Sequence, residues 1–246
     1  MGIFQTFWYG GALPEYVRVC LRSFILSGHS LEIYAYEDLA VPNGVILKDA
    51  KDIIPENEIF FYKNAYGSIR SVAAFSDLFR YELLLQKGNW WVDTDVFCLS
   101  SKLPPGEVYF GWQDSDNICN AIMKFPEGSE VSRELVRRSR AKQRDDLAWG
   151  EIGPQLVTQV VKDMHIEWMA YPLFYAYPIG YRDYSSIAQK LDRSLVQSKL
   201  ADVPFLHLWN EMFRLDPDRS LDNPEPGSLW EQLRSDIIHA TNDITF

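Results

Sequence analysis

Short runs of apolar residues typical of strands alternate along this chain with longer runs that have helical spacing. IFQTFWY, residues 3–9, is a β-branched and aromatic run closed by two glycines, and residues 14–28 then repeat apolar side chains at helical intervals. LEIYAYE, residues 31–37, has the pattern of a second strand. Because repeated strand–helix units pack as sheets covered by helices, we predict an α/β fold with a mostly parallel central sheet.

The same alternation continues through the rest of the chain. Residues 68–88 have the most pronounced helical spacing, and the run WWVDTDVF follows directly as a predicted strand. Later segments are predicted as strands (EVYFGW and ICNAIMKF), as helices (residues 129–144, residues 154–163 and SLWEQLRSDII) and as a loop rich in Asp and Pro (residues 215–227).

Size and charge limit the classes of protein that this chain can represent. With 246 residues, 47% of them hydrophobic, the chain is long enough for one sizeable core, so we expect a single domain over residues 1–246. Its formal charge of −10 argues against nucleic acid as a partner. The three cysteines, Cys20, Cys98 and Cys119, lack metal-type spacing and are expected to be buried. No 18-residue apolar run or signal peptide is evident, so a cytoplasmic location is expected.

Two aspartates, Asp93 and Asp95, end the apolar run WWVDTDVF. In a parallel sheet, ligand sites lie beyond the carboxyl ends of the strands, and in extended chain these two side chains point to the same side. Two carboxylates this close repel each other unless a cation lies between them, and Mg²⁺ or Mn²⁺ is the natural partner. The alternative is that the pair only opens a surface turn, for which Asp is a common residue.

The preceding helix carries two charges among apolar residues. Asp77 and Arg80 are three residues apart and therefore share one helix face. Buried charges need partners, so these residues form either an internal ion pair or a site for phosphate and sugar hydroxyls. Because the helix runs almost directly into the strand that carries the aspartates, Arg80 is placed within reach of a ligand there.

The stretch AAFSDLFRYELLLQKGNWWVDTDVF resembles the signature of the DXD-motif sugar-transferase family. These GT-A type glycosyltransferases include yeast initiating mannosyltransferases, α1,4-galactosyl- and N-acetylglucosaminyltransferases, bacterial capsule and lipopolysaccharide transferases and, more distantly, clostridial glucosylating toxins. FWYGG, GHSLEIYAYED, ICNAIMKFPEGS, IGPQLVT and HLWNEMF resemble other family segments.

The resemblance implies a Rossmann-like GT-A domain. Residues 1–125 would be its nucleotide-sugar-binding half, and residues 126–246 its acceptor side with a C-terminal segment that closes on the donor. It also implies a metal-dependent, retaining hexosyltransferase that uses a nucleotide sugar, with UDP favoured. The acceptor would be a glycan or lipid-linked glycan of bacterial surface polysaccharide.

The resemblance also implies roles for individual residues. Trp8 would stack on uracil, Asp77 and Arg80 would hold the sugar and phosphate of the donor, Asp93 would contact ribose and sugar, and Asp95 would ligate the metal directly. Asn120 would lie near the transferred sugar, and Gln155 would begin a helix whose N-terminal amides face the reaction centre. The alternatives are that Trp8 packs in the core and that Asn120 and Gln155 cap backbone groups.

The late sequence PFLHLW contains one histidine, His207, in an apolar run. Such a histidine is either a hydrogen-bonded core residue or, as the family's His-x-Trp segment implies, a ligand of the metal or diphosphate. The family's following Ser-Trp is replaced here by Met212-Phe213, and Trp209 either contributes to donor binding or packs.

One segment is basic although the whole chain is acidic. The predicted basic helix, residues 131–144, carries Arg133, Arg137, Arg138, Arg140, Lys142 and Arg144. It is either a solvated face paired with Glu130 and Glu134 or a peripheral contact with an anionic membrane or lipid-diphosphate acceptor.

Two other classes of protein share some of these features. A haloacid-dehalogenase-type phosphatase also uses Asp-x-Asp after an apolar strand, but normally near its N-terminus. A sugar-binding module without catalysis would fit the eight tryptophans.

Overall fold

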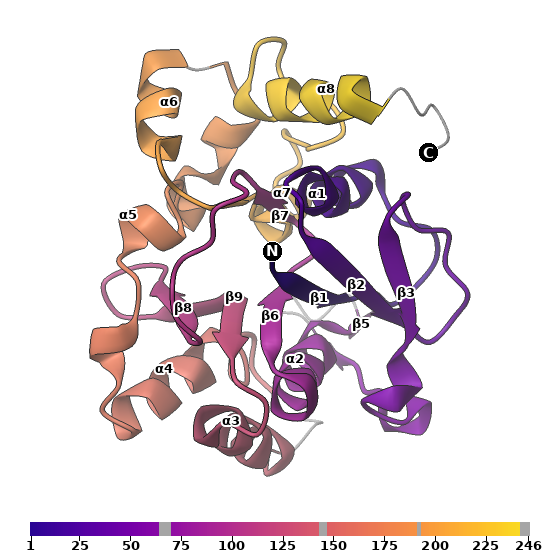
Figure 1. Ribbon diagram of the computed structural model, residues 1–246, viewed down its shortest axis with the longest axis vertical. Helices are drawn as coiled ribbons and strands as arrows, with labels where there is room; N and C mark the ends of the chain where they lie inside the picture. Colours follow the sequence, from indigo (N-terminus) through magenta and orange to yellow (C-terminus); the bar gives the residue numbers. More distant parts are fainter. Residues whose placement is uncertain (64–69, 143–146, 191–192, 242–246) are drawn as a thin grey trace.

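The computed structural model describes residues 1–63, 70–142, 147–190 and 193–241 (Figure 1). A six-stranded sheet in the order β3-β2-β1-β6-β9-β8 forms the centre of a single α/β domain. The strands are β1 (Ile3–Phe7), β2 (Ser30–Ala35), β3 (Val45–Asp49), β6 (Asn89–Val92), β8 (Tyr109–Trp112) and β9 (Ile118–Phe125). Neighbouring strands among β1, β2, β3 and β6 pair in parallel, and β9 pairs antiparallel with β6 and β8. The mostly parallel sheet predicted from the sequence is confirmed.

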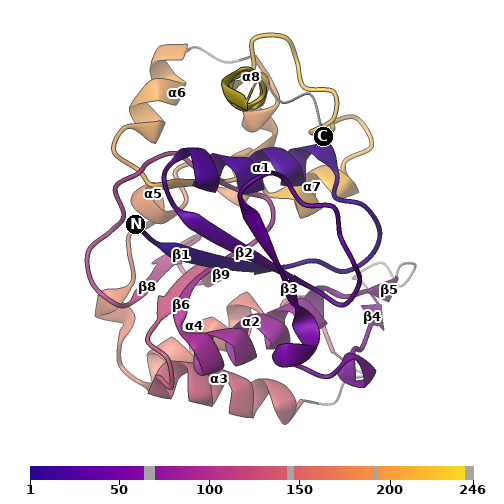
Figure 2. The ribbon, with the colours of Figure 1, turned by 45° about the vertical axis from the view of Figure 1, so that its right-hand side comes forward.

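Helices cover both faces of the sheet, as Figures 1 and 2 show. Helix α1 (Glu15–Leu26) lies on one face with α8 (Leu229–Thr241) against it, while α2 (Ala73–Lys87), α3 (Glu130–Arg140) and α4 (Pro154–Asp163) lie on the other. Strand side chains alternate between the two cores. Phe4 packs on Phe24 of α1 at a ring-centroid distance of 4.6 Å, whereas Phe7 stacks on Phe79 of α2 at 4.4 Å.

The two adjacent tryptophans of β6 divide between these cores in the same way. Trp90 joins the core beneath α1, Trp91 joins the core beneath α2, and both are buried. All three cysteines are buried with free thiols, as predicted.

Two predicted elements are corrected by the structure. WWVDTDVF is not one strand: β6 ends at Val92, a turn follows in which the amide of Val96 donates to the carbonyl of Asp93, and β7 (Val96–Cys98) leaves the main sheet. The helix predicted from residue 68 begins at Ala73, because Arg70–Ser71 form strand β5, which pairs with β4 (Tyr62–Lys63). Residues 64–69 lie outside the described part of the chain.

The C-terminal third is less regular. It contains the strand β10 (Phe205–His207) and the short helical segments η4 (Glu167–Met169), α5 (Leu173–Ala176), η5 (Tyr181–Ile187), α6 (Arg193–Leu200) and α7 (Asn210–Leu215). Two short turns, η1 (Ala50–Asp52) and η2 (Glu56–Glu58), lie in the N-terminal half of the chain. β10 pairs antiparallel with β7, so this late segment is anchored beside the aspartates. Within the described residues, no helix combines the length and apolarity needed to cross a bilayer.

The predicted helix 129–144 ends at Arg140, and Arg144 lies outside the described residues. Its other cations have acidic neighbours. Arg133 pairs with Glu130, Arg137 and Arg138 with Glu134, Arg138 also with Asp163, Arg140 with Glu58 and Glu82, and Lys142 with Glu151. The structure therefore favours the paired helix face over an anion-binding surface.

Candidate active site

Three parallel strands end at the same edge of the sheet, and each is followed by polar or aromatic residues. Trp8 follows β1, Glu37 and Asp38 follow β2 after one residue, and Asp93 follows β6. Residues 8–12 and 35–40 line a cavity of about 310 Å³ between the first two strand ends. Because β1 lies between β2 and β6, this cavity and the aspartates share one edge of the sheet, where α/β proteins bind ligands.

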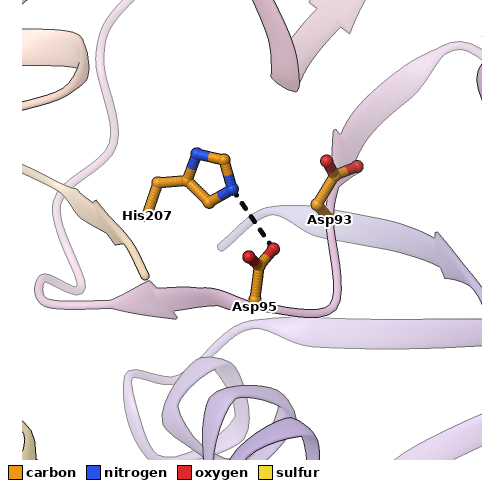
Figure 3. Close-up of side chains that lie close together, drawn as sticks. All are labelled: Asp93, Asp95 and His207. Carbon is orange, nitrogen blue, oxygen red and sulfur yellow. Dashed lines mark ion pairs between the residues drawn. The ribbon is translucent and has the colours of Figure 1, made fainter. Parts of the chain in front are cut away.

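Asp93, Asp95 and His207 converge at this edge (Figure 3). One ligand atom of each lies within 4.8 Å of the other two. The pairing of β10 with β7 places His207 opposite Val96, and the amide of Leu208 donates to the carbonyl of Asp95 at 2.9 Å. A histidine more than 100 positions later in the sequence is thereby held against the D-x-D turn.

Both carboxylate oxygens of Asp95 have partners. His207 Nε2 lies 3.2 Å from Oδ1, and the backbone N–H of Asn210 donates to Oδ2 at 2.8 Å. Burial opposes ionisation of Asp95, but the histidine and this N–H hold the pKa of Asp95 below its usual value. Burial likewise disfavours the imidazolium, yet Asp95 raises the pKa of His207 to about 10. At neutral pH without metal, the two residues therefore form a buried ion pair.

Asp93 has different partners. Its Oδ1 accepts from the indole N–H of Trp91 at 2.8 Å and lies 2.9 Å from Nη1 of Arg80. The guanidinium carbon of Arg80 lies 4.8 Å from the centre of the Trp91 ring. Burial raises the pKa of Asp93 although Arg80 opposes the shift. Arg80 and Trp91 therefore fix the carboxylate of Asp93 through the same oxygen.

Asp77 completes this arrangement on the other side of Arg80. Its Oδ1 lies 3.0 Å from Nη2 of Arg80 and accepts from Nδ2 of Asn120 at 2.7 Å. Burial raises the pKa of Asp77 to about 6, against the opposing effects of Arg80 and Asn120. Arg80 and Asn120, which the sequence analysis placed near the donor, are both buried here.

Two tryptophans, Trp8 and Trp209, were also candidate donor contacts in the sequence. Trp8 lines the cavity at the end of β1, and its indole N–H donates to the carbonyl of Gly10 at 2.7 Å. Trp209 is buried with its ring centroid 4.0 Å from that of His207, and its indole N–H donates to the carbonyl of Ile179. Its backbone is left-handed, with φ 57°, which begins α7 and directs the Asn210 N–H toward Asp95.

Gln155 is not brought together with these residues. Its side chain is exposed and lines a separate hollow with Arg137, Arg138 and Lys142. The backbone of Gly153 approaches the site instead, because a Cβ on Gly153 would lie 2.8 Å from Oδ2 of Asp77.

Several contributors to the site were missed in the sequence. Glu37 and Asp38 line the cavity, and their position at the end of the second predicted strand was a usable signal. Two other contributors had no signal in the local sequence: the backbone N–H of Asn210, and the hydroxyl of Tyr81, which donates to the carbonyl of Ile152 at 2.8 Å.

Comparisons with known proteins agree with this geometry. Residues 21–119 match the family described as "Glycosyltransferase sugar-binding region containing DXD motif". The matched part contains Asp77, Arg80, Asp93 and Asp95. A search of curated proteins finds no match. The family match over residues 21–119 agrees with the resemblance noted in the sequence.

One solved structure shares this fold, and a second aligns over most of the chain with a lower score. The PaToxG glycosyltransferase aligns with a TM-score of 0.50 and 14% identity over 67% of this chain and 68% of that one. GlyE of Streptococcus pneumoniae TIGR4 aligns with a TM-score of 0.45 and 13% identity over 97% of this chain and 62% of the other. The chain therefore shares the fold of the PaToxG glycosyltransferase.

Proposed function

We propose that this protein, a glycosyltransferase of the family whose sugar-binding region contains a DXD motif, transfers a hexose or N-acetylhexosamine from UDP with a divalent metal ion. The observation that supports this proposal most is the position of the Trp8 cavity and the Asp93, Asp95 and His207 cluster on one edge of the sheet. The cavity suits a nucleoside, and the cluster suits a metal-bound diphosphate.

The nucleoside would occupy the cavity after β1 and β2. The ring of Trp8, fixed by its hydrogen bond to Gly10, offers a face for the uracil base. Glu37 and Asp38 would accept hydrogen bonds from the ribose hydroxyls.

Asp93, Asp95 and His207 would hold the ion. Two carboxylates and one imidazole suit Mn²⁺ better than Mg²⁺, which prefers oxygen ligands and its own water. When bound, the ion would neutralise charge on the leaving diphosphate. Arg80 would contact the donor phosphate, and Asp77 with Asn120 would bind sugar hydroxyls and orient the anomeric carbon.

The acceptor would be a glycan or lipid-linked glycan of bacterial surface polysaccharide, such as capsule or lipopolysaccharide. Transfer would retain the anomeric configuration, with the leaving phosphate taking the acceptor's proton on the same face. The basic residues of α3 add little to membrane attraction, because their acidic partners offset their charge.

A thermal-shift panel of nucleotide sugars with and without Mn²⁺ tests the proposed function. At about 100 times its dissociation constant, the correct donor should stabilise the fold by about 2.7 kcal/mol. Slow metal-dependent hydrolysis of the stabilising donor should accompany the shift. Hydrolysis of a phosphate monoester instead would indicate the phosphatase, and binding without turnover would indicate a sugar-binding module.

A further inference from the structure

The hydroxyl of Tyr81 joins three elements behind the donor carboxylates. Tyr81 belongs to α2 and is fully buried. Its Oη donates to the carbonyl of Ile152 at 2.8 Å, in the turn before α4, and accepts from Nδ2 of Asn120 on β9 at 3.2 Å. One hydroxyl thus connects a helix, a strand and a turn that are far apart in sequence.

Both partners of Tyr81 are close to the carboxylate of Asp77. The same Nδ2 of Asn120 donates to Oδ1 of Asp77 at 2.7 Å. On the other side, Ile152 precedes Gly153, whose backbone comes so close that a Cβ would lie 2.8 Å from Oδ2 of Asp77. Each oxygen of this carboxylate is therefore approached by a group that Tyr81 holds.

The metal side of the site makes no direct hydrogen bond to this hydroxyl. Asp93 is held by Arg80, by Trp91 and by its own amide, which donates to the carbonyl of Ala121 at 2.8 Å. Asp95 is held by His207 and by the N–H of Asn210. None of these bonds includes Tyr81.

We propose that Tyr81 is a positioning residue for the sugar end of the donor site: its hydroxyl sets the Asn120 amide and the turn at residues 150–153, and through them the orientation of Asp77. This inference rests on the proposed function, because it assigns Asp77 to the transferred sugar. UDP alone, which lacks the transferred sugar, lies outside the influence of Tyr81.

The variant Tyr81→Phe removes the hydroxyl and keeps the buried ring. We expect kcat for Mn²⁺-dependent hydrolysis of the UDP-sugar identified by the thermal-shift panel to fall about tenfold, since small misplacements of a reacting group reduce rate. KM for that donor and the dissociation constant of UDP with Mn²⁺, measured by calorimetry, should each change less than about threefold, because the nucleotide and metal supply most ground-state binding.

The variant Gly153→Ala disturbs the same carboxylate from the opposite side. Its added Cβ must displace Oδ2 of Asp77 or the turn itself. The same pattern is expected, with kcat lowered at least as much as by Tyr81→Phe and UDP binding retained.

Thr158→Val provides a matched control. The Thr158 hydroxyl also links β9 to α4, since it accepts from the amide of Ile118 at 2.8 Å and donates to the carbonyl of Pro154 at 2.7 Å. It touches none of the donor residues, so this variant should lose stability without the selective loss of kcat.

Three results would overturn the inference. These are an unchanged kcat in Tyr81→Phe, a loss of UDP affinity that matches the loss of kcat, or an equal loss of kcat in Thr158→Val. If the wild-type protein neither binds UDP with Mn²⁺ nor hydrolyses a UDP-sugar, the proposed function itself fails, which is a distinguishable outcome.

Discussion

The side-chain partners of Asp93 come from one stretch of chain, whereas the partners of Asp95 come from a distant one. Asp93 is held by Arg80 and Trp91, all within the part that matches the family. Asp95 is held by His207 and Asn210, more than 100 residues later. The first carboxylate has a permanent cation as partner, and the second has a histidine whose charge depends on pH and on metal.

This difference separates two tasks that an Asp-x-Asp sequence could perform with either residue. A carboxylate already paired with arginine keeps a counterion without metal, as Asp93 does with Arg80. A carboxylate paired with a buried imidazolium can exchange that proton for a metal ion. We therefore expect Asp95 to control metal binding and Asp93 to control donor orientation.

Replacing each aspartate by asparagine tests this separation of roles. The largest effect on activity is expected for Asp95. Asp95→Asn should lower kcat/KM for donor hydrolysis about 1,000-fold at ordinary Mn²⁺, because the ion loses its charged ligand. The metal-free variant should also lose about 3 kcal/mol of unfolding free energy at neutral pH, because the buried ion pair between Asp95 and His207 is broken.

Asp93→Asn is the comparison. Arg80 keeps Asp77 as its partner, so the metal-free protein should melt near the wild-type temperature. Donor affinity should weaken by about 1–3 kcal/mol, while the Mn²⁺ midpoint moves less than it does in Asp95→Asn. A metal titration of hydrolysis and melting curves of both variants provide the data; identical behaviour of the two would remove the distinction.

Arg80→Lys probes the Asp93 side with a smaller expected effect. A single ammonium cannot contact Asp77, Asp93 and a phosphate as a forked guanidinium does. We expect kcat/KM for donor hydrolysis to fall about 30-fold, or about 2 kcal/mol. Wild-type kinetics in this variant would limit Arg80 to a structural role.

The pH dependence of metal binding probes the Asp95 side. Because the pKa of His207 is raised to about 10, the imidazole is protonated at neutral pH and must lose its proton to bind metal. Mn²⁺ affinity in the presence of UDP should rise about tenfold from pH 7 to pH 8, a range in which the UDP phosphates are already ionised.

His207→Gln should abolish that slope, since a neutral amide exchanges no proton. Calorimetric titrations at the two pH values measure it. A slope that persists in His207→Gln, or is missing in the wild type, would show that His207 does not bind the ion.

The smallest expected effect lies in the nucleoside cavity. Asp38→Asn should weaken UDP about fivefold, or about 1 kcal/mol, if its carboxylate accepts a ribose hydroxyl. Asp52→Asn, another exposed aspartate, serves as the control. Equal affinities in the two variants would remove Asp38 from the ribose site.

Sequence patterns predict the Asp93 side far better than the Asp95 side. The helix before the D-x-D and the aromatic strand are continuous in sequence, so their packing and the Asp77–Arg80 pair could be anticipated. The turn that brings Asp93 and Asp95 together was mistaken for extended chain, because β7 pairs with β10 rather than with the main sheet.

Contacts between distant segments have no local signal. The placement of His207 depends on a three-residue pairing with β7, and the cap on Asp95 depends on the left-handed backbone of Trp209. Gln155 faces a different hollow because Gly153, two residues earlier, carries the backbone past Asp77. The family resemblance supplied His207 where residue patterns alone left it undecided.

The most direct test of the metal centre is a calorimetric titration of UDP into the wild-type protein with Mn²⁺ and again after complete chelation. If Asp93, Asp95 and His207 hold an ion that binds the diphosphate, UDP affinity should be at least about 100-fold higher with Mn²⁺. Asp95→Asn should bring the two affinities close together. Equal affinity of the wild-type protein for UDP with and without Mn²⁺ would contradict the assignment of this cluster as a metal site.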